Sequence, residues 1–121
     1  MVKKEEKKSV ELDKKEYLIE VVDGHVQTAI SVSGFLRRLG YKTIEAYDAE
    51  VALKLAKENK PDLILIDTTL NGKGEDLAKQ LPNTKVIFMG TDGKLKKNIV
   101  GDIKKPIDNS ELEILIKKIL K

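Results

Sequence analysis

Apolar positions along the chain form short continuous runs, and segments with helical periodicity separate these runs. One run, 63–66, follows Pro61 and ends at Asp67, where polar residues and glycine take over. An unbroken apolar run is typical of a strand that is buried on both faces, as in a parallel sheet covered by helices. We therefore expect Asp67 at the carboxyl end of a central strand. Ligands of open α/β sheets bind at that edge, although a carboxylate there also commonly caps the following turn.

Five strands are predicted from such runs, at 17–22, 42–46, 61–67, 85–89 and 99–103. Helical spacing of apolar residues predicts helices at 26–39, 49–59 and 111–120, and a short helix that ends near Leu81. Between 95 and 99 there is room for little more than one helical turn. Asp48 is the expected N-cap of the second helix, and Asn109 or Ser110 that of the last. The alternation predicts an α/β fold, a doubly wound parallel sheet with helices on both faces.

Length and composition support one globular domain. The chain has 121 residues, of which 40% are hydrophobic, so it can bury a single core. The net charge is only +3 and basic residues are interleaved with acidic ones, which argues against a nucleic-acid surface. Cysteine is absent, which excludes disulfides, thiolate metal ligands and cysteine nucleophiles. No apolar run is long enough to cross a membrane, and we expect a cytoplasmic protein.

The first sixteen residues have a different composition from the rest. Eleven of them are Lys, Glu or Asp, and their few apolar residues are too sparse to bury a helix face. We expect a solvated, charged tail at 1–16 and a single domain at 17–121.

Polar side chains follow the predicted strands at one edge of the sheet. Asp23 follows the first strand, Asp67 ends the third, Thr91 follows the fourth, and Lys105 follows the fifth. Converging carboxylates repel unless a cation joins them, and oxygen ligands of this kind suit Mg²⁺. A nearby lysine can pair with a phosphoryl oxygen. The set therefore favours phosphoryl transfer onto a carboxylate.

Four segments of the chain, in order, resemble the receiver domain of two-component response regulators. They are 40–46 (GYKTIEA), 50–56 (EVALKLA), 60–67 (KPDLILID) and 105–112 (KPIDNSEL), and the resemblance extends over about 17–120. It implies a flavodoxin-like sheet with strand order 2-1-3-4-5, in which the third and fourth helices are short here. It also implies a non-enzymatic signalling domain that takes part in a phosphorelay.

The resemblance implies roles for individual residues. Asp67 corresponds to the phosphoryl acceptor, Asp23 to one of two paired metal-binding acids, and Lys105 to the lysine of the family. Thr69 falls where a backbone carbonyl contacts Mg²⁺. A histidine kinase or phosphotransfer protein and a downstream protein are the implied partners, without nucleic acid or membrane, and the domain is expected to be a monomer or weak homodimer without an output module.

The sequence also departs from the receiver pattern at positions that affect activity. Gly24 replaces the second metal-binding acid, so Mg²⁺ binding is expected to be weakened unless Glu20 or water substitutes. Gly90 stands where a switch Ser or Thr is usual, and Thr91 is the candidate to replace it. Asp102 occupies a position that is usually aromatic.

Two alternatives remain open at this point. A pseudo-receiver would signal through protein contacts without phosphate. A cobalamin-binding domain has a similar fold, and its Asp-x-His-x-x-Gly motif is matched at Asp23 and His25, with His25 as the cobalt ligand; the later segment 39–41 also resembles that family. Thr28 replaces the motif glycine, however, and that function gives Lys105 no role.

Overall fold

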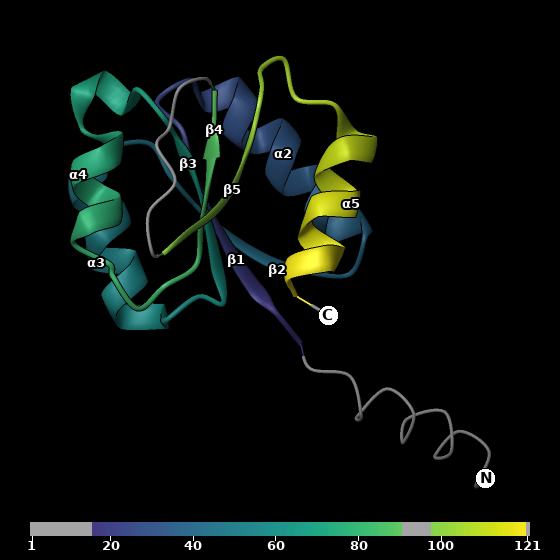
Figure 1. Cartoon of the computed structure of the whole chain (residues 1–121), viewed down its shortest axis with the longest axis horizontal. Coiled ribbons are helices and arrows are strands. Elements are labelled where there is room, and N and C mark those ends of the chain that lie inside the picture. The colour runs from purple at the N-terminus through teal and green to yellow at the C-terminus, as the bar shows by residue number, and fades with distance from the viewer. Residues whose placement is uncertain (1–15, 91–97, 121) are drawn as a thin grey trace, which may run out of the picture.

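The structure, a computed structural model, describes residues 16–90 and 98–120. Five parallel strands form one sheet in the order β2-β1-β3-β4-β5, as the sequence predicts (Figure 1). The strands are β1 (Leu18–Val22), β2 (Lys42–Ala46), β3 (Leu63–Asp67), β4 (Val86–Met89) and β5 (Ile99–Ile103). All carboxyl ends therefore meet at one edge of the sheet.

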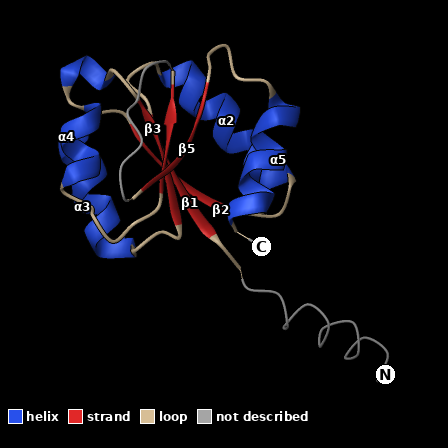
Figure 2. Cartoon of the chain, viewed as in Figure 1, coloured by secondary structure: helices blue, strands red, loops and turns tan. Residues whose placement is uncertain are grey.

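Helices cover both faces of the sheet, which confirms the predicted fold class (Figure 2). α2 (Val26–Arg38) and α5 (Asn109–Ile119) lie on one face, and α3 (Ala49–Asn59) and α4 (Gly74–Lys79) on the other. A short 3₁₀ turn, η1 (Leu70–Gly72), precedes α4. The third helix, α4, has six residues and is short as predicted. The predicted charged tail (1–16) and the short fourth helical segment fall almost entirely outside the described residues.

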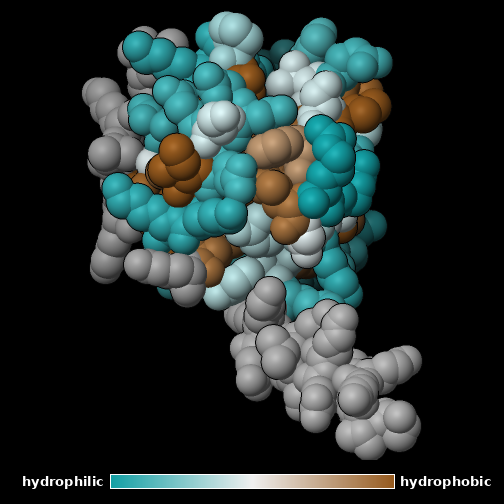
Figure 3. Space-filling model, turned by 90° about the vertical axis from the view of Figure 1, so that its right-hand side faces the viewer, coloured by the Kyte–Doolittle hydropathy of each residue, from teal (hydrophilic) through white to brown (hydrophobic). Residues whose placement is uncertain are grey.

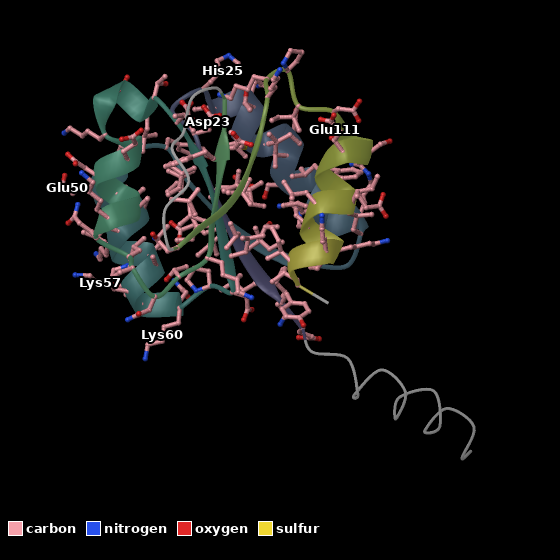
Figure 4. The ribbon with its side chains drawn as sticks, in the orientation of Figure 1. Asp23, His25, Glu50, Lys57, Lys60 and Glu111 are labelled. Atoms are coloured by element: carbon pink, nitrogen blue, oxygen red, sulfur yellow. The ribbon has the colours of Figure 1, made fainter. Side chains whose placement is uncertain are left out.

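The two faces of the sheet have separate cores. Ile19, Val21 and Leu65 pack with α2 and α5, whereas Val22 and Ile66 pack with α3 and α4. Successive residues of a strand point to opposite faces, so a strand buried on both sides must be apolar at every position. This requirement explains the unbroken apolar run of β3. The charged side chains Glu50 and Lys57 of α3 point away from the sheet (Figure 4).

Side-chain caps set two of the helix starts. Asp48 Oδ1 accepts a hydrogen bond from the Val51 amide at 2.8 Å, which confirms Asp48 as the cap of α3. The predicted cap of α5 was wrong: Asp108 Oδ1, not a side chain of Asn109 or Ser110, accepts from the Ser110 amide at 2.8 Å. A cap must precede the first helical residue, and α5 begins at Asn109, earlier than its apolar pattern indicates. Among the described residues, no helix is long and apolar enough to cross a membrane.

Candidate functional site

Three charged side chains converge at the carboxyl edge of the sheet. Lys105 Nζ lies 2.7 Å from Asp23 Oδ2 and 3.5 Å from Asp67 Oδ1. Figure 4 shows Asp23 and His25 together at this edge, beyond the end of β1. The structure therefore brings together three of the predicted site residues, although Asp23 and Lys105 are 82 positions apart in the sequence.

Asp23 is fully buried, and two bonds hold its carboxylate. Its Oδ1 accepts a hydrogen bond from the His25 amide at 2.8 Å, and its Oδ2 accepts from Lys105 Nζ. A buried carboxylate needs such partners, because the loss of water is otherwise costly. The ammonium group of Lys105 thus fixes the orientation of Asp23 and offsets part of the negative charge at the site.

Asp67 is held by the turn that follows β3. Thr69 donates to it from the backbone amide, at 3.3 Å to Oδ1, and from Oγ1, at 3.2 Å to Oδ1 and 3.3 Å to Oδ2. The carboxylate keeps some exposure, 13% of its side-chain surface, so a reactant can reach it. The Thr69 carbonyl accepts from the amides of Gly72 and Lys73. The role of the Thr69 carbonyl as a Mg²⁺ ligand stays a prediction. The two hydrogen bonds that its oxygen accepts engage both lone pairs and so compete with metal binding.

A hollow of about 420 Å³ lies in front of these groups. Its lining is formed by Asp23, Gly24, His25, Asp67, Thr69, Leu70, Asn71, Gly90 and Lys105. Two carboxylates and nearby amide and carbonyl oxygens suit a hard cation such as Mg²⁺, which usually binds one or two carboxylates and keeps several waters. In the described part of the chain, no three His, Cys, Asp or Glu side chains gather closely enough to form a metal cluster. The residues fit a Mg²⁺ site with few charged ligands.

Glu20 does not replace the missing acid of this site. It lies in the middle of β1, paired in register with Ile44 and Ile64, about 10 Å along the strand from Asp23. Its neighbours along the strand, Ile19 and Val21, point toward α2. Successive strand residues point to opposite faces, so the Glu20 side chain points toward α3. Its side chain is fully buried, and its oxygens have no hydrogen-bond partner among the described residues. Burial raises the pKa of Glu20 to about 8, so it is neutral below that pH.

Gly90 takes a conformation that suits glycine, with φ +129°. A Cβ atom on it would lie 3.1 Å from Thr68 Oγ1, so the Thr68 hydroxyl occupies the space next to the usual switch position. This hydroxyl donates to the Met89 carbonyl at 3.1 Å. Thr91, the predicted substitute for the switch hydroxyl, lies outside the described residues. Asp102 is an exposed residue of β5.

The turn after Asp67 has an unusual backbone. Leu70, Asn71 and Gly72 all have positive φ, at 36°, 56° and 80°. Asparagine tolerates this region better than most residues, and leucine does so at a cost of about 1 kcal/mol. The turn carries Asn71 to the rim of the hollow, a position that sequence analysis missed. The Asn71-Gly72 pair in the sequence predicts a turn, but it does not predict where that turn places the Asn71 side chain.

Comparison with known proteins identifies the family. The model of the response regulator receiver domain matches residues 19–117. The chain belongs to the response regulator receiver domain family. This family functions in two-component signalling, and its members generally bind Mg²⁺ and interact with histidine kinases or phosphotransfer proteins. The match favours the receiver interpretation over cobalamin binding. His25, the cobalt ligand of that alternative, is exposed and its Nδ1 lies 2.8 Å from Thr28 Oγ1.

Two curated relatives come from Bacillus subtilis. The receiver is 41% identical over 69 residues to the alkaline phosphatase synthesis transcriptional regulatory protein PhoP, covering 56% of this chain and 29% of that protein. The chain thus spans under a third of the length of that relative. It is 27% identical over 112 residues to sporulation initiation phosphotransferase F, covering 83% of this chain and 90% of that protein.

Solved structures show the same fold. A CheY-like receiver domain protein from Methanospirillum hungatei superposes with a TM-score of 0.75 at 23% identity, covering 88% of this chain and 94% of that one. A CheY-like receiver domain from Methylobacillus flagellatus gives a TM-score of 0.77 at 22% identity, covering 87% and 99%. At this level of identity, these similarities speak for the fold alone.

Proposed function

We propose that the protein is a phosphorylatable receiver, in which Asp67 accepts a phosphoryl group in the presence of Mg²⁺ and thereby changes its contacts with a partner protein. The observation that carries this proposal is the convergence of Asp23, Asp67 and Lys105 around an open hollow. The partly exposed carboxylate of Asp67 beside the Lys105 ammonium group has the geometry of an acceptor with charge stabilisation next to it.

The chemistry follows from the position of each side chain. An oxygen of the Asp67 carboxylate attacks the phosphorus, and the bond from phosphorus to the donor breaks with its electron pair leaving on the donor. Lys105 is close enough to move from Asp67 Oδ1 to a phosphoryl oxygen while it still contacts Asp23. Mg²⁺ bound beside Asp23 and Asp67 would neutralise charge on the transferred group. Phosphoryl transfer needs little more than positioning and such neutralisation.

A second depression adjoins the hollow and supports a protein donor. It has a volume of about 970 Å³, lies between α2 and the segment after β5, and shares His25 and Lys105 with the hollow. Ile30 and Ile107 give it apolar surface, while Arg37 and Arg38 add positive charge. Figure 3 shows apolar side chains among hydrophilic ones on this side of the molecule. A histidine kinase or phosphotransfer protein that docks here would present its phosphohistidine next to Asp67.

A pseudo-receiver is the second candidate, and two observations favour it. Gly24 leaves the metal site without its second acid, and Lys105 already pairs with both carboxylates, so one of their two negative charges is offset without a metal ion. In that case, the depression between α2 and the segment after β5 would be a docking surface only.

The deciding experiment is intact-mass analysis after incubation with Mg²⁺ and acetyl phosphate. We expect the protein to gain one phosphoryl group, and Asp67→Asn to gain none, because the amide is a poor nucleophile. The matched control is Asp76→Asn, which changes an exposed acid of α4 and should react like the wild type. If folded wild-type protein gains no mass at any Mg²⁺ concentration, the phosphorylatable receiver is excluded and the pseudo-receiver stands. A gain that persists in Asp67→Asn would show that another residue is the acceptor.

A further inference from the structure

The metal site of this receiver has two weak points on opposite sides. On the β1 side, Gly24 brings no carboxylate. On the β3 side, the Thr69 carbonyl accepts from the amides of Gly72 and Lys73 and so has no free lone pair. Asp23 and Asp67 alone would leave most ligand positions of Mg²⁺ to water. A further oxygen ligand from the protein would strengthen this site.

The side chain of Asn71 reaches the gap that Gly24 leaves. A Cβ atom on Gly24 would have Asn71 Nδ2 at 4.0 Å and the Tyr47 carbonyl oxygen at 3.7 Å. Both Gly24 and Asn71 line the hollow together with Asp23 and Asp67. The side-chain amide of Asn71 thus extends from the turn after β3 toward the loop after β1. It lies next to the region that a carboxylate on residue 24 would occupy.

The backbone of the turn explains how Asn71 comes to this position. Its left-handed conformation, φ 56° and ψ 39°, belongs to the turn Leu70–Gly72, which directly follows the hydrogen bonds from Thr69 to Asp67. Rotation about the last side-chain torsion exchanges Nδ2 and Oδ1, because the amide is planar and of nearly equal shape at both ends. The oxygen can therefore face the cation without movement of the backbone.

We propose that the side-chain oxygen of Asn71 is a Mg²⁺ ligand that takes the place of the carboxylate missing at Gly24. The inference rests on the proposed function, since it assumes a cation beside Asp23 and Asp67. An amide oxygen is a neutral ligand for such a cation. The site would then regain the ligand position lost at Gly24 while it carries one negative charge less than a site with two paired acids.

Glycine is the matched substitution for a test, because it adopts positive φ without strain while it removes the side chain that carries the amide. Mg²⁺ binding to the whole chain is measured by isothermal titration calorimetry, with Mn²⁺ and its paramagnetic signal as a second probe. We expect Asn71→Gly to raise the Kd for Mg²⁺ at least about tenfold, as losses at metal sites commonly do. Asn71→Asp, which also tolerates this backbone, should lower the Kd because it adds a charged ligand.

A rescue variant separates ligation from a role in the turn. The space around Gly24 admits a side chain, since the nearest atoms lie 3.7 Å or more from its Cβ position. The double variant Asn71→Gly with Gly24→Asp should therefore regain Mg²⁺ affinity at or above that of the wild type. Unchanged affinity in Asn71→Gly would overturn the proposal and show that Asn71 only shapes the turn.

A further pair of variants distinguishes this inference from the proposed function. Asp23→Asn and Asp67→Asn should each weaken Mg²⁺ binding whether or not Asn71 is a ligand. If these two lose affinity while Asn71→Gly does not, the inference fails and the phosphorylatable receiver stands. If the folded wild-type protein binds neither Mg²⁺ nor Mn²⁺, both are overturned.

Discussion

The carboxylic acid side chain of Glu20 is fully buried on the face of the sheet that α3 covers. Its neighbours across the strands are Ile44 and Ile64, and no described group donates to its oxygens. An ionised carboxylate in such a place lacks both water and a partner, so the folded protein holds the proton. Glu20 does not line the hollow, and we expect its effect to be on stability.

The stability of the protein is expected to depend on pH through Glu20. Its pKa rises from 4.5 to about 8 on folding, because burial disfavours the charged form. Below pH 4.5 the group is protonated in both states. Between pH 4.5 and about 8 the unfolded chain is ionised and binds fewer protons than the folded protein, so the free energy of unfolding falls as pH rises. The total loss is on the order of 5 kcal/mol, since each pKa unit is worth about 1.4 kcal/mol.

Urea unfolding at pH 5 and pH 8 measures this effect. Glu20→Leu places an apolar side chain among apolar neighbours, and we expect it to be more stable at pH 8 and to lose much of the pH dependence. Glu58→Gln, an exposed residue of α3, should keep the wild-type slope. Equal slopes in wild type and Glu20→Leu would mean that Glu20 finds a partner or water in solution.

At the scale of elements, the junction of β3 and α4 depends on Gly74. A Cβ atom there would collide with the carbonyl oxygens of Thr68 and Asp67. The first turn of α4 therefore lies directly against the backbone that carries Asp67, the proposed acceptor. The missing side chain at Gly74 allows β3, the left-handed turn and α4 to follow one another within a few residues.

Gly74→Ala is expected to destabilise the protein by about 1–3 kcal/mol, because backbone atoms must shift to admit the methyl group. The shift moves the turn that holds Thr69 and Asn71, so Mg²⁺ affinity should fall as well. Gly34→Ala is the control: it lies in α2, and the nearest atoms to its Cβ position are arginine side-chain ends at 3.9 Å. That variant should be about 0.5–1 kcal/mol more stable than the wild type. Urea unfolding measures the stability of both variants. If Gly74→Ala is as stable as the wild type, this account of the junction is wrong.

At the scale of the whole molecule, Lys105 links the C-terminal part of the chain to the ends of β1 and β3. The segment after β5 delivers it to Asp23, at the end of β1, and to Asp67, at the end of β3. This edge of the sheet therefore also carries a structural link between the outer strand β5 and the inner strands β1 and β3. Its ammonium group and a bound Mg²⁺ would serve partly the same purpose, since each would reduce the repulsion between the carboxylates of Asp23 and Asp67.

Lys105→Gln is expected to make the stability of the protein more dependent on Mg²⁺. Without Mg²⁺ the variant should lose about 1–3 kcal/mol, because the buried carboxylate of Asp23 loses its charged partner. A bound ion restores about 2.7 kcal/mol at a hundredfold excess over Kd. Thermal melts with and without Mg²⁺ measure the difference, and we expect a larger Mg²⁺ shift in Lys105→Gln than in the wild type.

The control for this comparison is Lys117→Gln, which removes an exposed ion pair with Glu113 on α5. Its response to Mg²⁺ should equal that of the wild type. An equal response in Lys105→Gln would show that Lys105 and Mg²⁺ act independently.

The sequence by itself determined the order and type of the elements and the strand ends at which Asp23, Asp67 and Lys105 lie. Local periodicity carries this information, because a strand buried on both faces and an amphipathic helix each impose their own repeat on the chain. Where the pattern was ambiguous, the result was less accurate: Asp108 caps α5 because the helix begins before its first apolar residue.

Only the tertiary structure decided how these residues meet. The 2.7 Å contact of Lys105 with Asp23 joins residues 82 positions apart. The approach of Asn71 to Gly24 depends on a left-handed turn whose direction no local repeat encodes, and Glu20 faces α3 rather than the hollow because of strand parity and sheet order. Contacts between distant segments arise from loop geometry and packing, which act only once the sheet has formed.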